Sequence, residues 1–171
     1  MTAGTIPTNG SRVVVSPDNS VAIESFEIDH PGTGQVLIET VRTLISAGTE
    51  LGSQEQRRTQ DFSPGYSNTG HIIALGEGVD DYAVGDRVLS MGRHASHVTT
   101  STEPRALARL PEGVSFDDGA YGVLGSVSMH GIRKARIEIG EFVAVTGMGL
   151  VGQLALQLAA QTGCDLLIAV D

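Results

Sequence analysis

The sequence predicts a mixed α/β fold, in which a β-rich region is followed by a single βαβ unit. Two observations support this prediction. Short runs rich in Val and Ile alternate with turn-forming residues over roughly the first hundred positions. Residues 143–171 then read as a strand, a glycine turn, a helix and a second strand. A helical segment links the two regions.

The β-rich region contains a series of short strand-like runs. They are "RVVVS" (12–16), "VAIESFEI" (21–28), "QVLIETVRTLI" (35–45), "GHIIALG", "DRVLSM" and "HASHVTT". Turn sequences such as Pro31-Gly32-Thr33-Gly34 separate them. Strands this short, with this many turns, predict a small barrel-like or sandwich domain.

The linking helix is expected from about Phe116 to about Ala135. Ser115, followed three positions later by Asp118, resembles a capping box. The helix contains glycines at 119, 122, 125 and 131. Each glycine costs roughly 1 kcal/mol relative to alanine in a free helix. We therefore expect the helix to pack closely against a sheet, another helix or a cofactor.

The glycine turn matches the pattern G-x-G-x-x-G from Gly147 to Gly152. It follows the apolar strand "EFVAVT" and opens a helix in which Leu150, Leu154 and Leu158 form an apolar row expected to be buried. Gly163 is expected to end this helix, and "LLIAVD" supplies a second strand parallel to the first.

This arrangement predicts a dinucleotide-binding site. Glycines permit the tight turn, the approach of backbone to a pyrophosphate and the close packing of helix on strand. Asp171 ends the second strand, where a carboxylate would accept hydrogen bonds from a ribose 2′-hydroxyl and repel a 2′-phosphate, which favours NAD over NADP. The predicted cofactor-binding residues are Gly147, Met148, Gly149, Leu150, Val151, Gly152 and Asp171. The alternative is that the segment is a glycine-rich βαβ connection that binds no nucleotide. Asp171 would then be only a turn residue at the end of the strand.

Composition narrows the class of partner. The formal charge of −9 would repel nucleic acid. The single cysteine, Cys164, forms no intramolecular disulfide, which indicates a reducing, cytoplasmic location. The N-terminal "MTAGTIPTNGSR" lacks the apolar core of a signal peptide, and glutamines interrupt the most apolar helix, so no membrane association is expected.

Several stretches in order resemble the medium-chain dehydrogenase/reductase family of alcohol dehydrogenase-like enzymes. They are "SAGTE" (46–50), "PGYSNTGHIIALGEGV" (64–79), "YAVGDRV" (82–88), "ARLPEGVSFDDGA" (108–120) and "VTGMGLVG" (145–152). The resemblance implies a GroES-like β-barrel domain at 1–115 and a linking helix with the first βαβ unit of a Rossmann fold at 116–171. It also implies a small-molecule substrate and hydride transfer with a nicotinamide cofactor.

This sequence lacks the zinc ligands that are typical of the zinc-dependent members of the family. The positions matching the catalytic ligands hold Ala47, Tyr66 and, approximately, Ser126, and the four-cysteine lobe is missing. We therefore expect neither a catalytic nor a structural zinc. His94 and His97 lie three positions apart in a strand-like run, where they would point to opposite faces and chelate poorly.

Without zinc, another group must donate a proton to the substrate oxygen. Thr49 matches the family's proton-relay hydroxyl, and Tyr66 replaces a ligand histidine, so Thr49 and Tyr66 are the predicted catalytic residues. The alternative for Tyr66 is simple packing. Glu50 matches the acid that supports the metal site in the family and, with no metal to support, is expected to cap the local turn. The substrate is an alcohol, a carbonyl compound or an activated alkene. Zinc-free relatives include quinone and enoyl reductases, and the "SAGTE" and "PGYSNTG" turns resemble zinc-binding or bacteriochlorophyllide-type dehydrogenases.

The chain contains two of the roughly six parallel strands of a complete Rossmann fold. Three explanations are open. The chain is the N-terminal part of a longer dehydrogenase, a short protein whose sheet a homodimer or partner chain completes, or an inactive relative that acts as a binding or scaffold module. The bare strand edges favour pairing.

Overall fold

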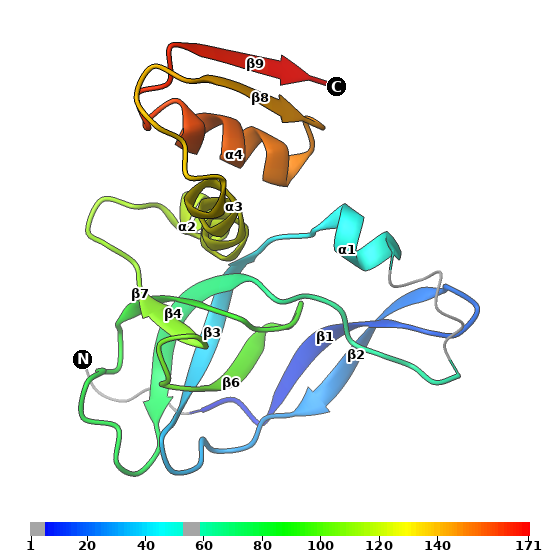
Figure 1. The fold of residues 1–171 in the computed structure, drawn as a ribbon. Coiled ribbons are helices and arrows are strands. Elements are labelled where there is room, and N and C mark those ends of the chain that lie inside the picture. The colour runs from blue at the N-terminus through cyan, green and yellow to red at the C-terminus, as the bar shows by residue number, and fades with distance from the viewer. Residues whose placement is uncertain (1–5, 53–58) are drawn as a thin grey trace. The chain divides into compact units, whose positions relative to one another are not determined.

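The protein, seen here as a computed structural model, is described over residues 6–52 and 59–171. These residues form two compact units that divide between Ala120 and Tyr121. The first unit contains the β-rich region and the second contains the βαβ unit, as Figure 1 shows. The predicted mixed α/β class is confirmed.

The first unit contains seven strands and two short helices among its described residues. They are β1 (Asn9–Val15), β2 (Val21–Glu27), β3 (Gln35–Thr43), α1 (Ala47–Gly52), β4 (Asn68–Leu75), β5 (Arg87–Ser90), β6 (His97–Ser101), β7 (Leu107–Arg109) and α2 (Phe116–Gly119). The six predicted strands are all present. The three-residue β7 and the helix α1 were not predicted.

Five strands of this unit form one curved antiparallel sheet in the order β6-β3-β4-β5-β7. β1 and β2 form a separate hairpin. Isolated bridges from Arg12 to Ala95 and from Val15 to Phe62 connect the hairpin to neighbouring loops. The unit is the GroES-like β-barrel of the predicted fold.

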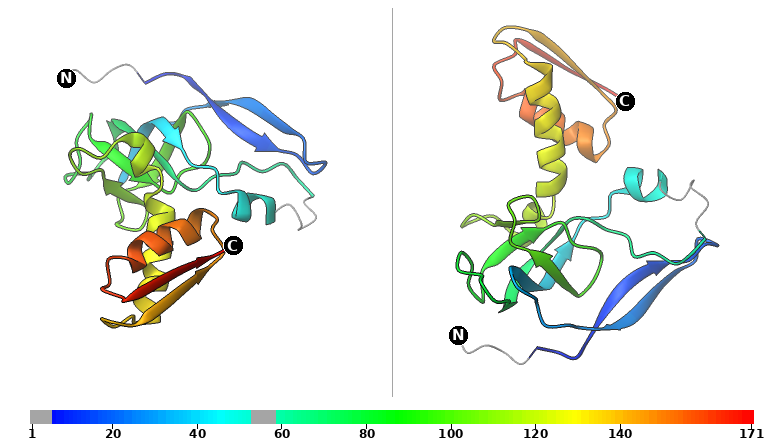
Figure 2. Two further views of the ribbon diagram at one scale, coloured as in Figure 1. Left: turned by 90° about the horizontal axis from the view of Figure 1, so that it is seen from above. Right: turned by 60° about the horizontal axis from the view of Figure 1, so that its bottom comes forward.

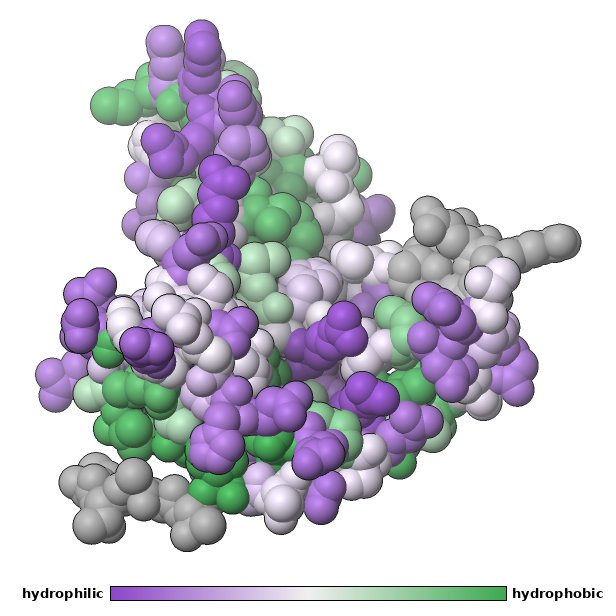
Figure 3. All heavy atoms as spheres, turned by 90° about the horizontal axis from the view of Figure 1, so that it is seen from below, coloured by the Kyte–Doolittle hydropathy of each residue, from purple (hydrophilic) through white to green (hydrophobic). Residues whose placement is uncertain are grey.

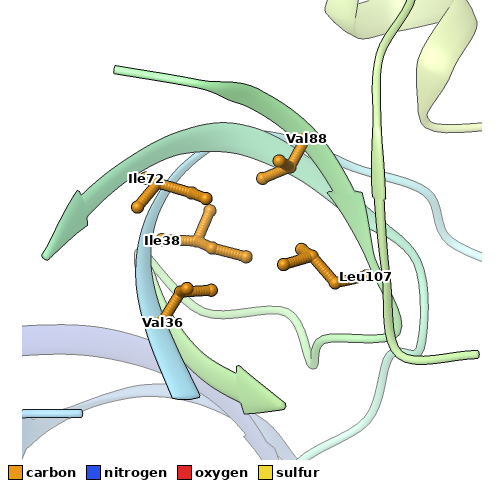
Figure 4. Close-up of a cluster of buried hydrophobic side chains, with 5 residues drawn as sticks. All are labelled: Val36, Ile38, Ile72, Val88 and Leu107. Atoms are coloured by element: carbon orange, nitrogen blue, oxygen red, sulfur yellow. The ribbon is translucent and has the colours of Figure 1, made fainter. Parts of the chain in front are cut away.

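The core of the curved sheet is a cluster of aliphatic side chains that meet across the concave face. Figure 4 shows the five members, which are Val36, Ile38, Ile72, Val88 and Leu107. Each is at most 3% exposed. Val36 and Ile38 are two positions apart on β3, so the period of the strand places both on the same face. Burial of β-branched side chains on a pleated surface explains why these Val/Ile runs form strands.

The helix predicted from Phe116 to Ala135 is interrupted. The structure has α2 (Phe116–Gly119) and then α3 (Gly122–Ala135), with Tyr121 at φ −77° and ψ −8° between them. The capping box is confirmed, because the Asp118 amide donates to the Ser115 hydroxyl at 3.0 Å. At the break, the Ala120 carbonyl accepts a 2.7 Å hydrogen bond from the hydroxyl of Ser67, 53 positions earlier.

The expectation that the helix glycines pack closely is correct at only one of the positions that can be tested. A Cβ at Gly119 would lie 2.6 Å from Leu110, so α2 does sit tightly on its own unit. A Cβ at Gly125 or Gly131 would meet no atom within 4 Å. The helix does pack against another helix, at residues 150–159, as expected, but the contact does not fall on these two glycines.

The second unit consists of α3 and the βαβ unit. The βαβ unit comprises β8 (Phe142–Thr146), α4 (Leu150–Ala159) and β9 (Leu166–Val170), with β8 and β9 parallel and Phe142 paired to Leu166. α4 packs against α3 and against one face of the two strands (Figures 1 and 2). This is the predicted first βαβ unit of a Rossmann fold. α4 ends at Ala159 with Ala160 as its C-cap, so Gly163, predicted to end the helix, lies instead at φ +82° in the turn three residues beyond the cap.

The buried face of α4 differs from the prediction. Leu150 and Val151 are 36% and 43% exposed, and the fully buried residue is Ala159. Leu154 and Leu158 are partly buried, so the Leu150–Leu154–Leu158 row is less buried than its spacing suggests. The other face of β8 and β9 is exposed, with Phe142 at 72%.

Apolar and hydrophilic side chains are interspersed on the face drawn in Figure 3. Within the part of the chain that the structure describes, no helix is long and apolar enough to cross a membrane.

The environment of His97 predicts that the stability of the first unit depends on pH. Its Nδ1 lies 3.0 Å from the Ser96 hydroxyl, whereas Nε2 is buried without a hydrogen-bond partner. Burial lowers the pKa of His97 below its ordinary value of 6.5, against the opposing effect of the Glu39 carboxylate. The unfolded chain therefore binds a proton at a pH where the folded chain does not.

We expect the free energy of unfolding to be fully retained above pH 6.5 and to decrease as the pH falls from there through the folded pKa of His97. Urea unfolding at a series of pH values measures this slope. His97→Gln should flatten the slope in that window. If the slope in His97→Gln equals that of the wild type, groups other than His97 cause the pH dependence of the unfolding free energy.

Candidate functional site

The glycine turn lies between β8 and α4 in the second unit. Gly147 has φ +85°, a backbone conformation that side chains rarely adopt. A Cβ at Gly152 would lie 1.7 Å from the Gly147 carbonyl oxygen. The turn therefore needs glycine at both positions, one for its conformation and one for the close approach of the helix to the turn.

The end of β9 lies against the same turn. The Gly147 amide donates to the Val170 carbonyl at 2.7 Å, and the Met148 amide donates to Oδ1 of Asp171 at 2.9 Å. The structure thus brings Asp171 to the glycine motif, although 19 positions (171 − 152) separate it from Gly152. A carboxylate already bonded to a turn amide shows that this turn accommodates an anionic oxygen.

The first turn of α4 presents backbone amides that no side chain caps. Gly149 is the N-cap residue in an extended conformation, with no side-chain capping bond. A Cβ at Gly149 would meet no atom within 4 Å, so there is space beside the backbone at this point. Uncapped amides and the positive end of the helix dipole favour an anion such as a diphosphate. Leu150 and Val151 form the exposed start of this helix.

A second group of polar side chains lies in the first unit. Thr49 on α1 places its hydroxyl 3.4 Å from the Tyr66 phenol oxygen, and the Ser46 hydroxyl donates to Thr49 at 3.4 Å. The structure therefore brings together the two residues predicted to handle a proton. These contacts are long for hydrogen bonds between hydroxyls, which leaves room for either group to turn toward another partner.

Glu50 has two roles in this group. Its Oε1 accepts from the Ser46 amide at 2.8 Å, which confirms the expected turn cap. Its two oxygens also lie 3.2 and 3.1 Å from Nε2 of His94, which is 5% exposed. Sequence reasoning missed this pairing, because no local pattern relates residues 44 positions apart.

The position of His94 corrects an earlier expectation. Sequence reasoning placed His94 and His97 on one strand, but β6 begins at His97 and His94 lies in the bend before it. Nδ1 of His94 instead lies 2.6 Å from the Thr43 hydroxyl at the end of β3.

The positions that match the family's catalytic zinc ligands do not form a ligand set. Ala47 and Tyr66 lie in the first unit, and the Ser126 hydroxyl, in the second, donates to the Val123 carbonyl at 2.7 Å. Across residues 6–52 and 59–171, no three His, Cys, Asp or Glu side chains are grouped so that they could hold a metal ion. Independence from zinc stays a prediction.

Comparison with known proteins identifies the family. No protein-family model matches the chain. The chain is 36% identical over 111 residues to D-guloside 3-dehydrogenase of Escherichia coli, an alignment that covers 64% of this chain and 32% of that protein. It is 26% identical over 206 residues to sorbitol dehydrogenase of Homo sapiens, covering 100% of this chain and 57% of that protein. The chain belongs to the medium-chain dehydrogenase/reductase family.

Solved structures agree at the level of the fold. The structure superposes on 2R,3R-butanediol dehydrogenase from Bacillus subtilis with a TM-score of 0.82 at 20% identity, covering 95% of this chain and 58% of that one. Medium-chain dehydrogenase/reductase membership accounts for both the curved β-rich unit and the βαβ unit. The chain spans 32% and 57% of the two curated relatives named above.

Proposed function

We propose that the protein is an NAD(P)-dependent oxidoreductase that transfers hydride between a nicotinamide cofactor and a small alcohol or carbonyl compound, or an activated alkene, without zinc. The observation that carries this proposal is the glycine turn from Gly147 to Gly152 with Asp171 hydrogen-bonded to its Met148 amide. A strand, a glycine turn, a helix and an acid at the end of the next strand are the parts from which dinucleotide-binding sites are built.

In our proposal, the second unit holds the cofactor. The amides of residues 148–152 would hold the diphosphate at the positive end of α4. Asp171 would exchange its bond with Met148 for one with a ribose 2′-hydroxyl and would repel a 2′-phosphate, so we propose NAD rather than NADP. When bound, the nicotinamide supplies or accepts the hydride.

The first unit would handle the proton. In our proposal, Tyr66 or Thr49 donates a proton to the substrate oxygen during reduction and accepts one during oxidation. The 3.4 Å separation between their oxygens supports a relay in which the threonine hydroxyl passes the proton to or from the phenol. Tyr66 as simple packing beside Thr49 is the alternative, which the Tyr66 variant distinguishes.

The exposed strands of the second unit support a further part of the proposal. Phe142, Leu166 and Ile168 are exposed, and Phe142 pairs directly with Leu166, so their side chains share one face of the sheet. We propose that a homodimer, or another chain that completes the sheet, covers strands of this unit.

Titration with NADH tests the proposed cofactor. We expect micromolar binding, followed by the change in NADH fluorescence, with NADPH about tenfold weaker because of Asp171. Asp171→Ser should bring the two affinities closer together, because it removes the carboxylate that repels a 2′-phosphate. Circular dichroism verifies that the chain is folded. A folded chain that binds neither nucleotide at millimolar concentration would contradict the proposal.

A further inference from the structure

The buried imidazole of His94 lies between the two segments that carry Thr49 and Tyr66. On one side, Nε2 contacts both oxygens of Glu50, the residue that follows Thr49. On the other side, a Cβ at Gly65 would lie 2.8 Å from Cγ of His94, so only a residue without a side chain lets the ring approach this closely. Gly65 immediately precedes Tyr66.

The backbone of His94 is fixed from two directions. Its amide donates to the Pro64 carbonyl at 2.9 Å, and its carbonyl accepts from the Val13 amide at 2.9 Å. The loop that leads into Tyr66 and the hairpin strand β1 therefore both hold the histidine. These bonds fix the backbone from which the imidazole projects, and the ring itself is held by its contacts with Thr43 and Glu50.

Hydrogen-bond roles around the ring place a proton in the contact with Glu50. The Thr43 hydroxyl donates to the Ser67 carbonyl at 3.0 Å, so it accepts from Nδ1–H of His94. The other ring nitrogen faces the Glu50 carboxyl at 3.1 Å. That contact needs a proton, carried either by Nε2 or by the carboxyl group. The two groups therefore share a hydrogen bond, and the imidazole side of this contact is buried.

The helix that carries Thr49 is tied to the rest of the unit in part through this contact. α1 has six residues, and an isolated helix of this length is unstable in water. Glu50 links the start of α1 to the rest of the unit, through the Ser46 amide and through His94. Removal of the imidazole would take away the contact between the Glu50 carboxyl, whose side chain is 17% exposed, and the bend that carries His94.

We propose that His94 is the positioning residue of this site: its imidazole holds Glu50 on one side and the Gly65–Tyr66 backbone on the other, and so sets the separation of the Thr49 and Tyr66 oxygens. The importance of this separation for turnover rests on the proposed function. The positioning itself is a property of the first unit alone.

The test uses the chain labelled with 3-fluorotyrosine and observed by ¹⁹F NMR. The sequence has three tyrosines, and the Tyr66 signal is the one lost in Tyr66→Phe. Thr49→Val shows how far this signal moves when the neighbouring hydroxyl is removed. We expect His94→Leu to move the Tyr66 signal by a comparable amount, and His94→Gln, which keeps a hydrogen-bonding group, to move it less.

A matched control is available in the same unit. His71 on β4 is also partly buried, with Nδ1 3.3 Å from the Gly85 carbonyl and its ring against Phe116. His71→Leu removes an imidazole of equal size that touches neither segment of the site. We expect this variant to lose stability without moving the Tyr66 signal.

Two outcomes decide the inference. A folded His94→Leu chain with an unchanged Tyr66 signal would overturn it. If His94→Leu does not fold, Glu50→Gln gives the same test, because it weakens the contact from the other side and should move the same signal. Where wild-type turnover is measurable, the His94→Leu change should lower it by at least about tenfold with the affinity for NADH unchanged.

The NMR test is independent of activity. A wild-type chain that fails to bind NADH would overturn the proposed function, whereas the Tyr66 signal would still report whether His94 positions the two hydroxyl groups. Failure of one proposal is therefore distinguishable from failure of the other.

Discussion

Gly152→Ala is expected to weaken NADH binding by about 100-fold or more, since the added Cβ would sit 1.7 Å from the Gly147 carbonyl oxygen. Backbone oxygen cannot yield as a flexible side chain can, so α4 must move away from the turn. The amides at its start would then no longer converge on a diphosphate. NADH fluorescence titration measures the loss.

Gly125→Ala provides the matched control for this change. Gly125 lies on α3 in the same unit, and a Cβ there meets no atom within 4 Å. We expect a gain in the free energy of unfolding of roughly 1 kcal/mol, because alanine is the better helix former, with NADH affinity unchanged. Equal NADH affinity in both variants and wild type would show that the glycine turn does not bind the cofactor.

Tyr66→Phe is expected to lower turnover by at least about tenfold while NADH affinity stays the same. The substitution removes only the phenol oxygen, which lies 3.4 Å from the Thr49 hydroxyl, and keeps the ring that fills the space. Loss of NADH absorbance in the presence of aldehydes, ketones and quinones measures turnover.

Tyr82→Phe serves as the control for the tyrosine change. The Tyr82 hydroxyl donates to the Leu107 carbonyl at 3.5 Å, beside the core of the sheet and apart from Thr49. This variant should retain wild-type turnover. If Tyr66→Phe also retains it, the ring of Tyr66 is packing, and Thr49 becomes the remaining candidate for proton transfer.

Local patterns predicted the elements whose causes are local. Val/Ile runs bounded by turn residues correspond to six strands, and the spacing of Gly147, Gly152 and Asp171 anticipated the meeting of Asp171 with the turn. Ser115 and Asp118 form the expected capping box because both partners lie within one turn of helix. Periodicity and capping rules describe short-range geometry of this kind.

Features that depend on distant contacts could not be predicted in this way. α1 contains two glycines in six residues, and Glu50 tethers it to a histidine 44 positions away. The break between α2 and α3 coincides with a hydrogen bond from Ser67, which no pattern around Ala120 encodes. The apolar row of α4 is correct in spacing, but tertiary packing buries Ala159 in place of Leu150.

The measurement that tests the central claim most directly is a ¹⁵N–¹H correlation spectrum of the chain with and without NADH. The account predicts that the amide signals of residues 147–152 and of Asp171 shift together as NADH is added. The Met148 signal should change strongly, because its bond to Asp171 would be replaced. A folded chain in which these signals stay fixed at saturating NADH would contradict the claim that this turn binds a dinucleotide.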